Sequence, residues 1–498
     1  WEEYNRLSCW IYTDMPGFRN PCLRMQFHNE GEHPVPDRWD REGHHNINLQ
    51  HGKWFHVQVE IPYIHRDDVI GISFDYDMCG HENDAADHVI WFIDKLELQK
   101  VDCDHYEGWI PKEDRICYSH CGYQPGAEKI AITSDAKTDH FKLIETASGK
   151  VVLEKEIETI DAEIGRLQIL DFSEIMEEGE YLLVAGDLTS RSFAISADVW
   201  ESSIWKVLNF FLALRCGYEV YGKHRKCHSD ILLKHGDKAI VADGGWHDAG
   251  DMSQNLINTA QTTYALFEIS QKLKENPPLY ARVLEEAKWG LDYVLKMRFG
   301  DGYRSTYTSS SIWTDGVIGT ADDITVRPAR LAYTNLNAAY AEALGVLAFA
   351  KVDPDYARYA LKIAKEDFDF GVEIWNETQE KSKSFNGDMQ FSIGDLTDPQ
   401  SCSVGAMAAA KLFEITKDPA YIGHAEFFGD IVMQCQQKEI TDWDIPMVGF
   451  FYQDRNKDLI WHHNHMSYSL MPSLAMRTLC EVFPDSPKYI DWYSTLAL

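Results

Sequence analysis

The spacing of hydrophobic residues changes from alternation to a helical period near residue 199. Before that point, short runs such as Trp54–Ile61 and Val69–Phe74 alternate apolar and polar positions, and His, Asp and Gly separate them. Beyond it, apolar residues recur every three or four positions, as in the stripe Ile204, Val207, Leu208, Phe211 and Leu212. Alternation is typical of half-buried strands, and a period of about 3.6 residues is typical of amphipathic helices. The sequence therefore predicts a multidomain chain in which all-β domains precede an all-α domain.

The β region divides into two predicted sandwiches. Residues 1–106 end in VIWFIDKLELQKV (89–101), which resembles the last strand of a jelly-roll carbohydrate-binding module. On that comparison, part of the first sandwich would lie before Trp1. Residues 107–197 contain about seven short strands spaced by about ten residues, from Lys129–Ile132 to Phe193–Ile195. This spacing suits an immunoglobulin-like sandwich.

The α region, residues 198–498, is expected to hold about nine paired helices. Asp-Pro-Asp-Tyr (353–356) and Asp-Pro-Ala-Tyr (418–421) place proline in the first turn of a helix, where it is tolerated. Paired helices build either a solenoid or a closed (α/α)6 toroid, and the lack of a strict repeat favours the toroid. The expected helices are 200–216, 254–275, 279–299, 333–351, 355–376, 401–417, 419–437, 465–482 and 487–498.

Composition narrows the classes of partner. The 498 residues include 79 Asp and Glu against 47 Lys and Arg, a net charge of −32. Such a chain repels phosphate backbones and anionic lipid, so we expect neither a nucleic-acid nor a membrane partner. No apolar run approaches the roughly 20 residues of a membrane helix. A neutral or cationic ligand fits best, and the oligomeric state cannot be read from the sequence.

Cysteine usage and the N-terminus say little about the compartment. The eleven cysteines are an odd number scattered along a large chain, unlike a disulfide-stapled secreted domain, and they are compatible with the cytoplasm. No charged-then-apolar leader follows Trp1, so no signal peptide is visible. The localisation therefore stays unknown.

The densest candidate chemistry is the segment DGGWHDAGD (243–251). Its glycines allow a tight backbone, and Asp248 and Asp251 lie three residues apart just before an expected helix. The positive end of a helix dipole keeps carboxylates ionised, which suits a base that activates water. The alternative is structural: one aspartate caps the helix and the other is a surface acid.

A second set of candidate residues has the spacing Cys-x10-Cys-His-x18-His. Two thiolates and two imidazoles, from Cys216, Cys227, His228 and His247, suit a closed tetrahedral zinc site. The residues alone leave two alternatives open: buried cysteines with chance histidines, or a Cys216–Cys227 disulfide.

These segments resemble family 9 glycoside hydrolases of the cellulase type with an N-terminal immunoglobulin-like domain. ADGGWHDAGDMSQNLINTAQTTYALFE is similar to the family's GGW-(Tyr/His)-DAGD motif, and NFFLALRCGYEV, KCHSDILLKHGDK and AKWGLDYVLKMRF follow the family's order. The resemblance covers about residues 115–498. It implies that Asp251 is the catalytic base, that Asp248 helps to hold the water, and that the four Cys and His residues bind a structural zinc.

The same resemblance implies inverting hydrolysis of a β-glycosidic bond in an oligo- or polysaccharide. Cellulose-type β-1,4-glucan is the usual substrate, while other β-glucans and glucosaminides stay open, as does endo or exo action. The family is usually secreted. Its general acid is a late Glu that follows His-x-Arg, after a Gly-x-Asn pattern, and neither motif occurs before Leu498. We therefore expect a C-terminally incomplete toroid that lacks the acid.

Other residues give weaker signals. Trp313, Tyr452 and Trp461 are candidate platforms for stacking sugar rings, although ordinary packing explains each equally well. Calcium is possible in an acidic loop, but Cys79 and Ala86 break the EF-hand pattern, and a solvated loop explains the charges as well. The carboxylates of that loop are Asp75, Asp77, Glu82, Asp84 and Asp87.

Two other classes of protein compete with an enzyme. A glycan-binding protein that has lost catalysis would not need the intact DAGD. A helical-repeat scaffold would not need Gly244 and Gly245 beside paired aspartates.

Overall fold

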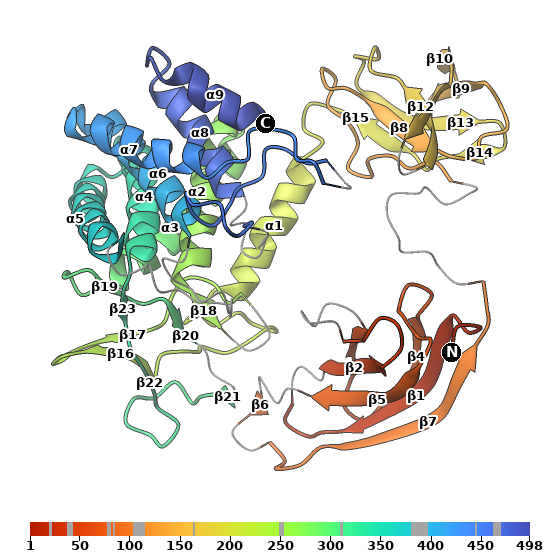
Figure 1. The fold of residues 1–498 in the computed structure, drawn as a ribbon, viewed down its shortest axis with the longest axis horizontal. Coiled ribbons are helices and arrows are strands. Elements are labelled where there is room, and N and C mark those ends of the chain that lie inside the picture. Colours follow the sequence, from red (N-terminus) through yellow and green to blue (C-terminus); the bar gives the residue numbers. More distant parts are fainter. Residues whose placement is uncertain are drawn as a thin grey trace. The chain divides into compact units, whose positions relative to one another are not determined.

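A computed structural model of the chain describes residues 1–18, 22–36, 43–76, 81–82, 85–102, 115–162, 165–248, 253–308, 312–379, 397–443, 446–461 and 470–498. It contains a sheet-rich region followed by a helical region (Figure 1). Contacts divide the chain into two compact units, one mostly of residues up to Asn209 and the other mostly from Phe210 onward. Among the described residues, no helix combines the length and the apolar character needed to cross a membrane.

The N-terminal residues form two three-stranded antiparallel sheets. Each sheet has a central strand, β1 in one and β2 in the other, that the sequence pattern did not single out. The segment 89–101, whose sequence resembles a last strand, forms strand β7 over Ile90–Gln99. Leu7 and Ile11 of β1 share a buried cluster with Met25 and Phe27 of β2, so the core includes residues of both sheets. The strands are β4 (Trp54–Glu60), β1 (Arg6–Asp14) and β7 (Ile90–Gln99) in one sheet, and β3 (His44–Asn48), β2 (Cys22–Asn29) and β5 (Val69–Tyr76) in the other.

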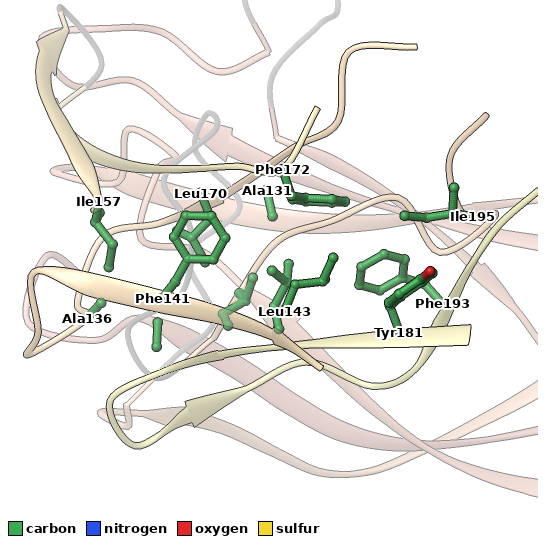
Figure 2. Packing of buried hydrophobic residues seen from close by; sticks show 13 residues of the cluster. Ala131, Ala136, Phe141, Leu143, Ile157, Leu170, Phe172, Tyr181, Phe193 and Ile195 are labelled. Atoms are coloured by element: carbon green, nitrogen blue, oxygen red, sulfur yellow. The ribbon is translucent and has the colours of Figure 1, made fainter. Parts of the chain in front are cut away.

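The next β region is a second sandwich with its own core. Phe141 and Leu143 of β9, Leu170 of β12 and Phe193 of β15 belong to one buried cluster that spans both sheets (Figure 2). Along β9, the buried Phe141 and Leu143 alternate with the exposed His140 and Lys142, as the period of two predicts. One sheet has β11 (Glu158–Ala162), β12 (Gly165–Asp171) and β8 (Ile130–Thr133), and the other has β10 (Val151–Glu156), β9 (His140–Glu145), β13 (Gly179–Ala185), β14 (Leu188–Thr189) and β15 (Phe193–Ile195).

The helical region is built from antiparallel helix pairs. The pairs α2/α3, α4/α5, α6/α7 and α8/α9 pack internally, and α2, α4, α6 and α8 pack against one another in sequence order (Figure 1). Helices α4 and α6 are buried on nearly all sides, as central helices require. The helices are α1 (Glu201–Leu214), α2 (Leu256–Lys272), α3 (Pro277–Lys296), α4 (Ala332–Phe349), α5 (Pro354–Gln379), α6 (Asp398–Thr416), α7 (Ala420–Gln434), α8 (Met471–Val482) and α9 (Tyr489–Ala497).

The loops of the helical region carry short strands that were not predicted. Hairpin β16/β17 turns at Gly236, and β22 joins β16 in parallel. The run DILLKHGDKAIV around that turn was a usable signal, because two short apolar runs flank a Gly-Asp turn. The pairs are β16 (Ile231–His235) with β17 (Lys238–Val241) and β22 (Ile324–Val326), β18 (Gln254–Asn255) with β20 (Tyr307–Thr308), β19 (Tyr303–Arg304) with β23 (Ala329–Arg330), and β6 (His81–Glu82) with β21 (Ile312–Trp313).

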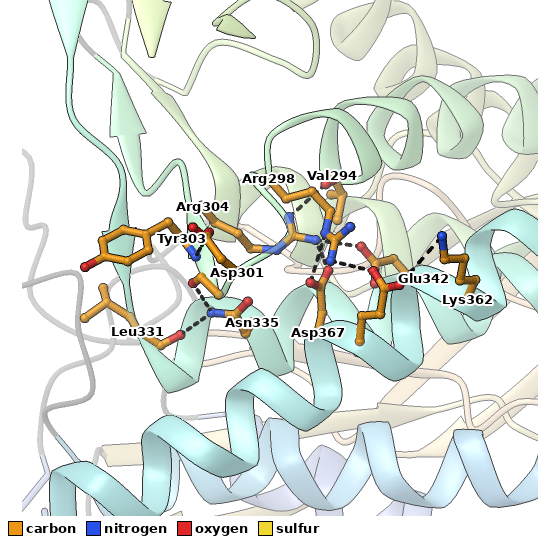
Figure 3. A network of polar contacts seen from close by, with 12 residues as sticks. Val294, Arg298, Asp301, Tyr303, Arg304, Leu331, Asn335, Glu342, Lys362 and Asp367 are labelled. Carbon is orange, nitrogen blue, oxygen red and sulfur yellow. Dashed lines mark hydrogen bonds and ion pairs between the residues drawn. The ribbon is translucent and has the colours of Figure 1, made fainter. Parts of the chain in front are cut away.

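A buried ion network ties several of these elements together (Figure 3). The guanidinium of Arg304 on β19 donates to Glu342 of α4 at 2.8 Å, to Asp367 of α5, and to the carbonyl of Val294 in α3 at 2.8 Å. Arg298 donates to the other oxygen of Asp367 at 3.0 Å. Arg304, Glu342 and Asp367 are each at most 1 % exposed. Their mutual pairing offsets part of the cost of burying these three groups.

Candidate active site and metal centre

The glycine-rich segment 243–248 lies against the C-terminal end of α1. The backbone N–H of Cys216 donates to Gly245 O at 3.0 Å, and that of His247 donates to Leu214 O at 3.0 Å. Gly245 has φ +64°, and a Cβ there would lie 2.9 Å from Thr259 Oγ1. Glycine is required at this position because a side chain would strain the backbone and collide with α2.

Helix α3 holds the same segment from another side. The buried carboxylate of Glu286 accepts hydrogen bonds from Trp246 Nε1 at 2.8 Å and from Arg215 Nη2 at 2.8 Å, and it pairs with Arg282 at 2.7 Å. Trp289 Nε1 donates to Gly245 O at 2.7 Å. Glu286 is fully buried, so two guanidinium groups and an indole N–H compensate its charge. These contacts hold the tryptophan that precedes His247 and Asp248.

Asp248 is fixed by two side chains that were not predicted from the sequence. Ser253 Oγ donates to Asp248 Oδ1, and Asn258 Nδ2 donates to Asp248 Oδ2 at 2.8 Å. The side chain of Asn255 caps α2 by accepting from Ile257 N at 2.7 Å, so Asp248 is not the helix cap. The sequence held a signal for Asn258, because it is a polar residue in the first turn of α2, the helix that directly follows the motif.

Asp251 lies outside the described residues, together with residues 249, 250 and 252. Its predicted role as the base therefore stays a prediction. The described residues on either side of it, Asp248 and Ser253, are joined by a backbone hydrogen bond from Asp248 N to Ser253 O at 3.1 Å.

The four predicted metal ligands come together. One ligand atom from each of Cys216, Cys227, His228 and His247 lies within 4.8 Å of the others, and all four residues are buried. The two sulfur atoms are 4.0 Å apart, far beyond a disulfide bond, and both thiols are free. Cys227 Sγ lies 3.3 Å from His247 Nε2. The disulfide alternative is therefore absent from this structure.

The donor set fits a metal ion. Both ring nitrogens of His228 are buried and have no hydrogen-bond partner, which is costly for an imidazole unless a cation binds it. His228 also has a left-handed backbone, φ +56°, a conformation that residues other than glycine rarely adopt outside special sites. Two thiols and two imidazoles are the ligands of closed zinc sites.

The thiols of the cluster differ in their electrostatic environment. Burial raises the pKa of the Cys216 thiol well above its ordinary value. The pKa of the Cys227 thiol is lowered, first by its hydrogen bond with Cys216 and then by the neighbouring imidazoles of His224, His228 and His247, against the effect of burial. The cluster thus favours a thiolate at Cys227.

The acidic segment 314–323 contributes to a second carboxylate cluster. Asp230, Asp315 and Asp322 place one oxygen each within 4.8 Å of one another. Protein donors already satisfy parts of this cluster: Thr314 Oγ1 donates to Asp230 at 2.6 Å, and Gly316 N donates to its other oxygen at 2.8 Å. In the acidic loop 75–87, the candidate calcium ligands Asp77, Asp84 and the side chain of Glu82 lie outside the described residues.

The three predicted aromatic platforms differ in their surroundings. Tyr452 is half-buried, and its hydroxyl donates to Gln437 Oε1 at 3.1 Å. Trp461 is 7 % exposed, so little of its ring is available for stacking in this structure. The side chain of Trp313 is not described. Trp443, which was not predicted, is 41 % exposed and stacks on Phe450 with ring centroids 5.4 Å apart.

The chain has β-sheet domains followed by paired helices, and its glycine-rich aspartate segment lies beside a Cys2His2 cluster. This arrangement agrees with the resemblance to glycoside hydrolases that the sequence shows. Residues 200–473, just over half of the chain, match the model of glycosyl hydrolase family 9, and residues 112–190 match that of the cellulase N-terminal ig-like domain. The chain belongs to glycosyl hydrolase family 9.

Known relatives share limited identity with this chain. Endoglucanase C of Cellulomonas fimi is 25% identical in an alignment of 364 positions that covers 62% of this chain and 32% of that protein. Endoglucanase D of Acetivibrio thermocellus is 26% identical in an alignment of 306 positions that covers 55% of this chain and 47% of that protein. The chain therefore spans a third to a half of the length of these relatives.

A solved structure titled Bacteroides ovatus GH9 has the same fold over much of the chain. It superposes with a TM-score of 0.54 and 18% identity, covering 77% of this chain and 71% of that one. At this identity the likeness concerns the fold.

Proposed function

We propose that the chain belongs to an inverting glycosidase that hydrolyses a β-1,4-glucan. Asp251 takes a proton from water, which attacks the anomeric carbon from the face opposite the leaving group. Asp248 helps to hold that water. The observation that carries the proposal is the fixed carboxylate of Asp248, whose two oxygens accept from Ser253 and Asn258 next to the motif of the family.

The general acid, which we propose to be a glutamate, protonates the leaving glycosidic oxygen, and none of the glutamates of this sequence is assigned to that role. In the family this residue follows a His-x-Arg motif, which this sequence lacks. An inverting pair needs carboxyl groups roughly 6.5–9.5 Å apart to leave room for the water. The helix pairs of the described region support an (α/α)6 toroid, in which the acid and Asp251 would face each other across the central cleft.

The test uses the complete gene product and identifies both the sugar and the stereochemistry. Products from a panel of neutral β-glucans and β-glucosaminides are analysed, and proton NMR follows the anomer that forms first. Asp251→Asn keeps the size of the side chain and removes the base, so turnover should fall by about 10²–10⁴-fold or more while folding is retained. Asp248→Asn should also lower turnover, to a smaller extent.

Asp237→Asn, in the exposed turn between β16 and β17, serves as the matched control and should leave turnover unchanged. Near-normal hydrolysis by Asp251→Asn would refute the assignment of the base. Binding of glucan without hydrolysis by the complete wild-type protein would instead indicate a glycan-binding protein on the same fold.

We further propose that Cys216, Cys227, His228 and His247 hold a structural zinc ion. The unpartnered nitrogens of buried His228 and the four converging ligand atoms support it. The ion would join the end of α1, the 227–228 segment and the segment that leads to Asp248. It would supply rigidity, and no position would remain open for catalysis.

Metal analysis of the purified protein tests this second proposal. We expect about one zinc ion per chain, and Cys227→Ser should lose the ion together with thermal stability, with a smaller effect on turnover. Cys402→Ser changes an equally buried thiol in α6 and should retain the ion. A metal-free wild-type protein with a Cys216–Cys227 disulfide in its mass spectrum would refute the site.

For substrate contacts, we propose the rings of Tyr452 and Trp313 as sugar platforms, whereas Trp461 is 7 % exposed and offers little ring surface in this structure. The Tyr452 ring lies 5.3 Å from that of Phe450, and Phe450 in turn stacks on the exposed Trp443. This group of aromatic rings supports a role for Tyr452 in stacking a sugar.

A further inference from the structure

Aromatic side chains gather on the outer face of the β4–β1–β7 sheet. Along β1, Leu7, Cys9 and Ile11 point into the core, whereas Trp10 and Tyr12 occupy the alternate positions and face outward. Trp10 remains 38 % exposed. Scattered exposed apolar residues are ordinary, but a contiguous group marks a binding surface.

Strand register places three of these rings in one row across the sheet. Tyr12 of β1 lies opposite Trp54 of β4 and Phe92 of β7. The Tyr12 ring centroid lies 5.5 Å from that of Trp54 and 5.9 Å from that of Phe92. Trp54 is 49 % exposed and Phe92 is 51 % exposed. The row is therefore continuous and accessible.

The neighbouring row combines an aromatic ring with polar groups. Trp10 lies opposite His56 of β4 and Asp94 of β7, and its ring stacks on the His56 imidazole with centroids 4.8 Å apart and planes 14° from parallel. Ser8 Oγ lies 2.9 Å from His56 Nε2 and holds that imidazole in place. Ring faces and hydrogen-bonding groups thus alternate on the same surface.

The surface is hollowed where these rows meet. Trp10, Trp54, Asp94 and Lys95 line a shallow depression of about 270 Å³. A second depression, of about 460 Å³, is lined by β3 and β4 residues that include His56. His56, which lines the second depression, stacks on Trp10, which lines the first. The polar lining of the second depression also includes Asn46, Asn48 and Gln58.

The charges of this face suit a neutral ligand. Arg6 and Glu60 pair with each other at 2.5 Å, and Asp94 and Lys95 bring one charge of each sign to the first depression. An anionic ligand would also meet the field of a chain with net charge −32. Aromatic faces, amides and balanced charges together match a neutral polyhydroxylated chain, whose apolar ring faces stack and whose hydroxyl groups form hydrogen bonds.

We propose that this face is a carbohydrate-binding site for a neutral β-glucan chain, with Trp10 and Trp54 as its main stacking residues. The choice of glucan rests on the proposed hydrolysis of β-glucans, whereas the site itself rests on the rings and depressions of the face. The site would retain the protein on its polymeric substrate.

The test measures binding and hydrolysis separately on the complete gene product. Binding is measured by depletion from solution onto insoluble cellulose at 4 °C and by retardation in gels that contain a soluble neutral β-glucan. Hydrolysis is measured on a short soluble cello-oligosaccharide. The double variant Trp10→Ala/Trp54→Ala should weaken binding about tenfold or more, as expected for loss of central aromatic residues. Hydrolysis of the short substrate should stay unchanged.

Two variants serve as controls. Trp200→Ala removes a tryptophan of similar exposure, 47 %, that is not on this face, and it should bind normally. Trp54→Tyr keeps an aromatic ring and should retain most binding, which separates loss of stacking from loss of folding.

Wild-type binding by the double variant would overturn the proposal. The proposal would also be overturned if the double variant changed its oligomeric state and bound glucan as the wild type does, because the face would then be an interface between copies of the chain. If the wild type binds glucan through these residues but hydrolyses none of the panel, the binding site stands and the proposed hydrolytic function fails.

Discussion

Single side chains in the motif owe their positions to partners far along the chain. The carboxylate of Glu286 holds Trp246 and Arg215, and Asn258 holds Asp248. Because Asp248 is exposed, these hydrogen bonds, rather than burial, limit its orientation. The conformation of the motif therefore depends on contacts with helices α2 and α3.

Removal of the Asn258 amide should lower turnover. In Asn258→Ala, one oxygen of Asp248 loses its donor, and the water that Asp248 is proposed to hold becomes less well placed. Loss of one hydrogen bond of this kind costs about 1–1.5 kcal/mol, or about tenfold in kcat, with little change in KM. Steady-state kinetics on a neutral β-glucan measures this. Gln271→Ala removes an amide at the opposite end of α2 and should have no effect; equal kinetics for the two variants would contradict the role of Asn258.

Asp171 at the end of β12 should make the second sandwich sensitive to acid. Its pKa is lowered to about 2, first by hydrogen bonds from Ser173 and then by Lys155 at 3.0 Å. Since the carboxyl group has a lower pKa when folded, its stabilising effect is complete above about pH 4 and disappears as the pH falls toward 2. Hydrogen exchange of the β12 amides between pH 2 and 6 should show this loss of protection.

In Asp171→Asn that pH-dependent part of the protection should be absent, while the exposed Asp161→Asn on β11 should behave as the wild type. Unchanged pH dependence in Asp171→Asn would show that other groups cause the acid sensitivity.

Pairs of secondary-structure elements are joined by buried polar contacts as well as by apolar packing. Arg304 lies between α4 and α5 and bonds to a carboxylate of each. Burial is the main cause of the raised pKa of Glu342, and the neighbouring Asp367 adds to it, while Arg304 opposes it. The hairpin α4/α5 and strand β19 therefore form one unit that depends on the guanidinium group.

Loss of one carboxylate from this network should destabilise the helical region strongly. Asp367→Ala leaves Arg304 and Arg298 partly unpaired in the interior, and such a change costs about 3–5 kcal/mol of unfolding free energy. Urea unfolding followed by circular dichroism at 222 nm measures it. Asp355→Ala removes an exposed ion pair with Arg358 on the same helix and should cost less than about 1 kcal/mol. Similar losses in both variants would mean that Arg304 tolerates the loss of this partner.

For the whole molecule, the net charge should discriminate between substrates. A chain of −32 repels anionic glucans over a distance set by the Debye length, about 30 Å at 0.01 M salt and about 3 Å at 1 M. The KM for a carboxymethylated β-glucan should therefore fall severalfold between these salt concentrations. The KM for a hydroxyethylated β-glucan should change little, and parallel changes for both polymers would exclude an electrostatic cause.

The sequence alone determined where the helices and several strands lie and which residue types are available for catalysis and metal binding. Alternation and the helical period depend on which side of each element is buried, so they predicted several strands of the two sandwiches and all nine helices described here, the helices within a few residues. The types and spacing of Cys216, Cys227, His228 and His247 suited a zinc site but left other uses open, and only the resemblance to the family favoured the cluster that the structure shows.

Only the tertiary structure decided which distant residues meet. Asp367 reaches Arg304 across 63 positions, Glu286 reaches Arg215 across 71, and Trp54 joins Tyr12 in a row with Phe92. Such contacts depend on strand register and on how helices pack, and neither leaves a periodic signal in the chain. In the sequence, the charged residues of these pairs cannot be distinguished from ordinary surface residues. They become partners because the fold buries them next to each other.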